Sequence, residues 1–131
     1  MDKVLKAIAV VIGFLIGWWA GLSPVVQVLI VVMAFDIVTG AMRAAKDHAI
    51  TTDKAFWGVT RKVLILILVG VCSFIGQAMG NAGLGDAAAA YYVYSEGMSA
   101  LDNLAALGVP FPDWLKAIFQ NLSGHKPEGG Q

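Results

Sequence analysis

Residues 63–79 read VLILILVGVCSFIGQAM, and no charged residue occurs anywhere from Val63 to Gly85. A run of this length is typical of a helix that crosses a bilayer, because ~20 helical residues at ~1.5 Å each span a ~30 Å hydrocarbon core. We place the span at about residues 61–79, where two basic residues open it. This segment predicts the fold class, an all-α integral membrane protein.

The composition agrees with that class and argues against others. Hydrophobic residues make up 58% of the 131 residues and charged residues 14%, whereas globular domains are about half apolar and a quarter charged. A formal net charge of zero argues against a basic nucleic-acid surface. The single cysteine, Cys72, can form neither an internal disulfide nor a structural zinc site. No catalytic or phosphate-binding motif occurs, so we expect no enzyme activity, cofactor or metal.

Three more apolar segments flank the central one. We predict a single membrane domain over residues 1–122 with four transmembrane helices at about 4–22, 24–45, 61–79 and 86–107. A short amphipathic helix at 113–122 is expected to lie in the interface, and residues 123–131 to be a disordered tail. The alternative is three spans, because Glu96 and Asp102 in the fourth segment each cost ~2.5–3.5 kcal/mol at membrane depth.

The basic residues predict the orientation. The two loops near 21–24 and 80–86 contain no Lys or Arg, whereas the loop at 46–60 and the adjoining helix ends are basic. Cytoplasmic loops carry the Lys/Arg excess, so we expect both termini and this loop on the cytoplasmic side. The residues assigned to this cytoplasmic basic loop are Lys46, Lys54, Arg61 and Lys62.

Two polar stripes interrupt the apolar segments. Asp36, Thr39, Gly40 and Arg43 share one helix face by i, i+3, i+4, i+7 spacing, and Glu96, Ser99 and Asn103 share another. Asp36 is expected to face a lumen, to pair with a basic group on another helix, or to reach the headgroups. Glu96 is expected to be buried or lumenal, or else to lie on the wet face of an interfacial helix. These seven residues are the candidates for a lumen or an inter-helix contact.

Glycines recur at helical spacing on two of the segments. Gly13, Gly17 and Gly21 repeat every fourth residue on the first segment, and Gly76 and Gly80 do so on the third. Glycine lets helix backbones approach closely in lipid, so these positions are candidates for helix packing within one chain or between copies.

The polar elements follow an order that resembles the phage holin family, which includes the toxin-secretion and lysis holins of clostridial phages and toxin loci. The matching elements are Asp36-Ile37-Val38-Thr39-Gly40, Arg43-Ala44-Ala45-Lys46, Thr51-Thr52, Gly58, Arg61-Lys62, Glu96, Ser99, Asp102-Asn103-Leu104 and Gly108-Val109-Pro110-Phe111-Pro112. They cover about residues 25–122. The chain departs from the family pattern at Asp102, where Glu is expected, and at Gly97, where a larger residue is expected.

The resemblance implies a function in host cell lysis. Such holins collect in the bacterial cytoplasmic membrane, oligomerise, and form lesions that release an endolysin or, in some loci, a toxin. The expected partners are therefore the lipid bilayer, further copies of the chain and, functionally, an endolysin, with no nucleic acid. Two other functions fit the residues: a small membrane transporter or channel that uses Asp36 or Glu96, and a non-lytic antiholin or regulator.

Overall fold

The computed structural model describes residues 2–122, which fold into five α-helices. They are α1 (Asp2–Gly21), α2 (Pro24–Lys46), α3 (Thr52–Ala78), α4 (Leu84–Ala106) and α5 (Asp113–Leu122). The all-helical class predicted from the sequence is confirmed for this part of the chain. The predicted disordered tail, residues 123–131, lies outside the described residues.

The helix starts follow from local capping. The Ser23 hydroxyl accepts from the Val26 backbone N–H at 3.4 Å, and Pro24 stands at the first position of α2, where no amide proton is needed. The Thr51 hydroxyl caps α3 in the same way by accepting from the Lys54 N–H at 3.3 Å. From the sequence we expected a threonine at 51 or 52 to cap a short helix leading into the span at 61–79; in the structure the two form one unbroken helix, which Gly58 does not interrupt.

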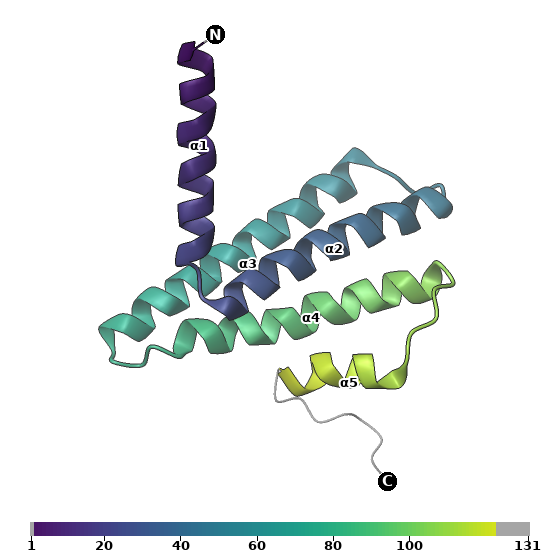
Figure 1. Cartoon of the computed structure of the whole chain (residues 1–131). Helices are drawn as coiled ribbons and strands as arrows, with labels where there is room; N and C mark the ends of the chain where they lie inside the picture. The colour runs from purple at the N-terminus through teal and green to yellow at the C-terminus, as the bar shows by residue number, and fades with distance from the viewer. Residues whose placement is uncertain (1, 123–131) are drawn as a thin grey trace.

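The centre of the bundle is α4, which packs against α2, α3 and α5 (Figure 1). The hydrophobic core lies between α2, α3 and α4. It consists of Leu29 and Met33 from α2, Ile65 and Val69 from α3, and Ala89 and Val93 from α4. The α2 and α3 helices scarcely touch each other. A Cβ added at Gly85 of α4 would lie 2.7 Å from the Ser73 Cβ, so glycine is what lets α3 and α4 approach at this point.

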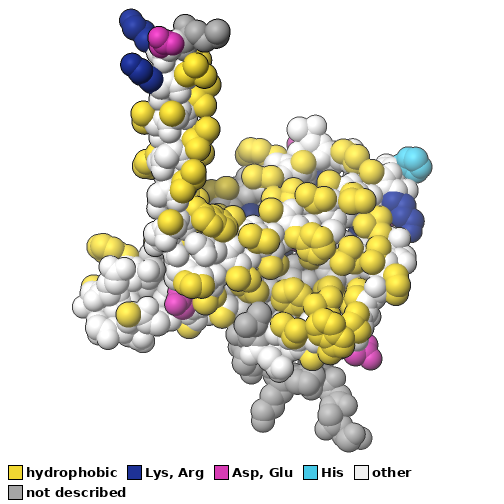
Figure 2. Space-filling model, in the orientation of Figure 1, with side chains coloured by type: hydrophobic (Ala, Val, Ile, Leu, Met, Phe, Trp, Pro, Cys, Tyr) yellow, Lys and Arg dark blue, Asp and Glu magenta, His cyan; other side chains and the backbone are white. Residues whose placement is uncertain are grey.

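In contrast, α1 leaves the bundle at a steep angle and has no buried residue (Figure 1). Apolar side chains cover its visible face, while charged side chains gather at its free end (Figure 2). Apolar surface of this extent is not left in water by a folded protein, so lipid or another helix must cover it.

Three helices, α1, α2 and α3, are long and apolar enough to cross a membrane. Among the described helices, α4 does not reach that apolar level although its 23 residues are long enough. Length and composition therefore support three spans, and the fourth remains a prediction.

Candidate functional site: a buried charged cluster between three helices

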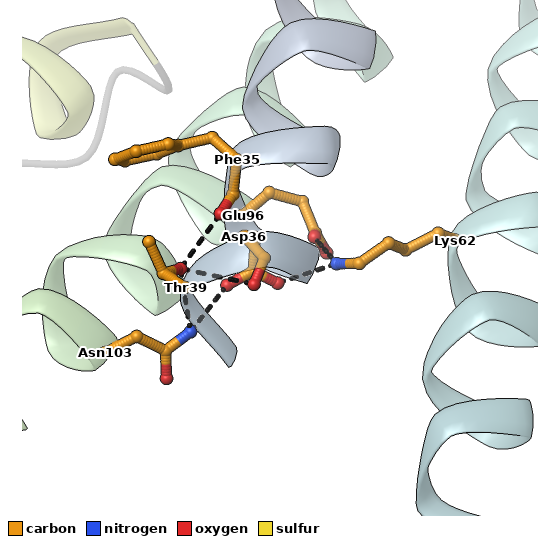
Figure 3. Close-up of polar contacts among 6 residues, drawn as sticks. All are labelled: Phe35, Asp36, Thr39, Lys62, Glu96 and Asn103. Carbon is orange, nitrogen blue, oxygen red and sulfur yellow. Dashed lines mark hydrogen bonds and ion pairs between the residues drawn. The ribbon is translucent and has the colours of Figure 1, made fainter. Parts of the chain in front are cut away.

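A lysine from α3 reaches between carboxylates of two other helices. The Lys62 ammonium donates to the Asp36 carboxylate of α2, with an Nζ–Oδ2 distance of 2.6 Å, and to the Glu96 carboxylate of α4 (Figure 3). The side chains of Lys62 and Asp36 are each 12% exposed, and that of Glu96 is 3% exposed. One cation thus joins three helices at a buried position.

Amide and hydroxyl groups extend the cluster along the contact between α2 and α4. The Asn103 Nδ2 donates to the Asp36 Oδ1 at 3.1 Å and to the Thr39 Oγ1 at 3.2 Å (Figure 3). The Thr39 hydroxyl in turn donates to the Phe35 carbonyl at 2.9 Å. Gly40 lies at this contact, where an added Cβ would be 3.5 Å from the Asn103 amide nitrogen, an ordinary van der Waals distance.

Two basic residues at the end of α2 continue the contact. The Arg43 guanidinium donates to the Asn103 Oδ1 at 3.4 Å, and the Lys46 ammonium donates to the Ala106 carbonyl at 2.7 Å. A cation near the last carbonyl groups of a helix is favoured by the helix dipole. At the opposite end of the bundle, the Ser23 hydroxyl donates to the Asp86 carboxylate at 2.7 Å. Polar contacts therefore join α2 and α4 at both ends and in the middle.

The charged cluster lies at one depth in the three-helix unit. Asp36 lies ten residues before the end of α2, Glu96 ten before the end of α4, and Lys62 ten after the start of α3. At ~1.5 Å per residue this is ~15 Å from one end of the bundle. If the unit spans the bilayer, the Lys62 ammonium offsets one of the two carboxylate charges at this level and donates to both carboxylates, whereas a lone charge there would be costly.

The two polar stripes noted in the sequence face each other across the α2–α4 contact. Asp36, Thr39 and Gly40 lie on one side, and Glu96 and Asn103 lie on the other. Ser99 is exposed at the edge of this contact. Among residues 2–122, no buried side-chain nitrogen or oxygen lacks a hydrogen-bond partner. The arrangement can hold helices together and keep charge away from lipid, as a fully satisfied polar network does.

Sequence reasoning placed Lys62 in a cytoplasmic basic loop and missed its contacts. In the structure Lys54, Arg61 and Lys62 lie on α3, and Lys46 is the last residue of α2. A signal was present: Lys62 directly precedes the uncharged run from Val63 to Gly85, so its side chain starts beside the apolar part of the helix. The spacing of residues along one helix does not reveal which residues of other helices the Lys62 side chain contacts.

The candidate packing glycines differ in their surroundings. A Cβ at Gly13, Gly17 or Gly21 would meet nothing within 4 Å, so these three make no close contact with another described helix. Gly76 is tightly packed: a Cβ there would lie 2.4 Å from the Asn81 carbonyl oxygen. Gly80 lies beyond the end of α3 with a φ of 72°, a backbone conformation that favours glycine in a turn.

The departure from the family pattern at Gly97 has a local reason. Gly97 is buried on α4 beside Glu96, and the Phe119 ring of α5 lies where a side chain would be. An added Cβ would lie 2.4 Å from that ring. The small residue therefore makes room for α5, which packs along α4 (Figure 1).

Taken together, three helices of spanning length and charges paired between helices define a helical membrane protein. The family model of the bacteriophage holin family matches residues 10–124. The chain therefore belongs to the bacteriophage holin family.

Known relatives extend over most of the chain. An uncharacterised 14.9 kDa protein in the nagH 3′ region of Clostridium perfringens is 31% identical over 96% of this chain and 100% of its own length. A probable holin of Bacillus phage phi105 is 33% identical over 66% of this chain and 64% of its own length. An uncharacterised protein of Listeria monocytogenes, Lmo0128, is 28% identical over 98% of this chain. No solved structure matches the chain.

Proposed function

We propose that this chain is a holin that oligomerises in the bacterial cytoplasmic membrane and forms lesions through which an endolysin reaches the cell wall. The observation that carries the proposal is membership of the holin family over residues 10–124. The similarity to a probable phage holin supports it. Release of a toxin in place of an endolysin is a second outcome of the same lesion.

The buried cluster supports a closed form of a single chain. Asp36, Lys62 and Glu96 bind one another between the helices, so a single copy keeps these three groups away from lipid. Separation of α4 from α2 and α3 would expose these groups. In a lipid environment they need water or another polar surface, and a lumen between several copies provides both.

The uncovered surface of α1 supports association between copies. None of its residues is buried, and its three spaced glycines leave open space on the helix surface. In lipid, small residues at such spacing allow close contact between helices. We propose that α1 packs against a second copy in the oligomer.

We further propose that α4 crosses the membrane with α2 and α3, which gives four spans and places both termini in the cytoplasm. The support is its position, because α4 packs along both apolar helices and its acid is paired there. The basic residues of α2 and α3 then lie toward the cytoplasm, as the distribution of Lys and Arg favours.

The test is induced expression in a bacterial host, alone and with a cytosolic endolysin that has no export signal. Membrane potential, culture density and released endolysin are followed together. We expect abrupt depolarisation at a set time, and clearing of the culture only when the endolysin is present. Growth with intact potential would contradict the holin proposal and favour a transporter or an antiholin.

A matched pair of variants links the lysis to the buried cluster. Glu96→Gln removes a charge that is buried against Lys62, whereas Asp102→Asn removes an exposed charge from the same helix. We expect Glu96→Gln to change the time of lysis and Asp102→Asn to leave it unchanged. If both variants lysed cells at the same time, the buried cluster would have no part in the timing of lesion formation.

A further inference from the structure

A cavity of about 440 Å³ opens between α2 and α3, next to the charged cluster. The two helices scarcely touch each other, and at this level the Lys62 side chain of α3 reaches across to Asp36 of α2 (Figure 3). Its floor is the α4 face that carries Glu96, Ser99 and Asn103. A volume of this size lies within the ~300–1,000 Å³ of sites that hold small molecules.

The walls of the cavity are apolar, with several alanines among larger aliphatic side chains. On α2 they are Ile37, Ala41 and Ala44, and on α3 they are Ala55 and Val59. Such walls suit a hydrocarbon chain and offer it little specific recognition. The cavity is too small for a whole helix, whose diameter with side chains is ~10–12 Å.

The charged residues of the lining favour an anion. Lys54, Arg61 and Lys62 line the cavity together with two acids, Asp36 and Glu96. Both acids are already bound by Lys62. Among the described residues, neither Lys54 nor Arg61 has an ion-pair partner, so two cations of the lining are free to meet a ligand.

The two free cations lie on one face of α3. Lys54, Gly58 and Arg61 have i, i+4, i+7 spacing, so the glycine lies between the two basic residues. A Cβ at Gly58 would meet nothing within 4 Å. A ligand can therefore enter the cavity past Gly58, where no side chain blocks access to the basic and apolar residues of the lining.

We propose that this cavity is a binding site for an anionic phospholipid. The headgroup phosphate pairs with Lys54 and Arg61, and an acyl chain lies against the small apolar residues of α2 and α3. Basic pockets between membrane helices on the cytoplasmic side bind anionic headgroups in this manner. The proposal rests on α2–α4 being embedded in the bilayer and does not depend on lesion formation.

The site is tested with the full-length chain in nanodiscs that contain phosphatidylcholine and phosphatidylglycerol at four to one, an anionic fraction of ~20%. Spin-labelled phosphatidylglycerol and spin-labelled phosphatidylcholine report the fraction of each lipid held at the protein. We expect phosphatidylglycerol to be preferred, and the preference to fall about fivefold for each cation lost in the Lys54→Gln/Arg61→Gln double variant.

Two further variants locate the effect. Lys3→Gln/Lys6→Gln makes the same charge change on α1, outside the cavity, and is expected to keep the preference. Gly58→Leu keeps every charge and fills the opening, and is expected to abolish the preference. Equal losses in the two double variants, or an unchanged preference in Gly58→Leu, would overturn the site.

Free phosphate distinguishes a lipid from a simple anion. Inorganic phosphate added to the same nanodiscs is expected to leave the spin-labelled phosphatidylglycerol in place. If inorganic phosphate displaced the spin-labelled phosphatidylglycerol, the site would bind a simple anion, and the assignment to a lipid would be overturned. Because the readout is lipid binding, a chain that fails to lyse cells still tests this proposal.

Discussion

Removal of the Lys62 ammonium tests whether the charged cluster holds the three helices together. Lys62→Met keeps an unbranched side chain and deletes the cation that binds Asp36 and Glu96. Two carboxylates then remain buried with exposed fractions of 12% and 3%. Loss of one partner of a buried ion pair destabilises a protein by about 3–5 kcal/mol, because the other charge is left uncompensated.

Two further variants distinguish the effect of the lost charge from other effects of the Lys62→Met substitution. Arg61→Met deletes the neighbouring cation, which is exposed and lies in no ion pair with a described residue, so its effect is expected to stay within about 0.5 kcal/mol. The triple variant Asp36→Asn/Lys62→Met/Glu96→Gln removes all three charges. It is expected to recover most of the lost stability. A buried charge without a partner destabilises the fold more than a neutral polar group of the same shape does.

The free energy of unfolding is measured from loss of helical circular dichroism when sodium dodecyl sulfate is added to the chain in a mild detergent. The expected order of stability is wild type and Arg61→Met, then the triple variant, then Lys62→Met. The reasoning would be refuted if Lys62→Met unfolded within about 0.5 kcal/mol of the wild type. It would also be refuted if the triple variant were less stable than Lys62→Met.

Three substitutions at other contacts give further expectations, measured by the same unfolding curves unless stated. Asn103→Ala leaves buried groups of α2 without a donor and should cost about 1–3 kcal/mol, whereas the exposed Ser99→Ala should change stability by less than about 0.5 kcal/mol. Gly85→Ala places a Cβ 2.7 Å from the α3 serine and should cost about 1–3 kcal/mol, whereas Gly70→Ala meets nothing and should cost none. Gly97→Ala displaces the α5 phenylalanine ring, so hydrogen exchange should rise in α5 and stay unchanged in α2–α4.

The helices could be predicted from the sequence because their signals are local. Apolar runs, the turn at Ser23-Pro24 and the glycine-rich stretch near residue 80 gave ends close to those observed for α1, α2, α4 and α5. The predicted span at 61–79 covers only the later part of α3, because the polar residues from 52 to 60 predicted a separate short helix and not a continuous one. The Thr51 cap starts the helix there, and Gly58 does not interrupt it.

The candidate site could be predicted only in part. Helical spacing placed Asp36 and Thr39 on one face and Glu96 and Asn103 on another, and both faces take part in the α2–α4 contact. The role of Lys62 could not be predicted in the same way. A basic residue at the head of an apolar run also fits the positive-inside rule, which accounts for Arg61 equally well. Only the packing of α3 against α4 distinguishes the two neighbours.

The low hydropathy of α4 and its central position have one physical cause. A helix that packs against α2, α3 and α5 shows little surface to lipid, so its polar residues need partners in the protein and not an apolar solvent. Glu96 and Asn103 have such partners. The same side chains become costly once those neighbours move away, because lipid can satisfy neither of them. The lesion proposed above requires a face that favours water over lipid, and separation of α4 from its neighbours would supply one.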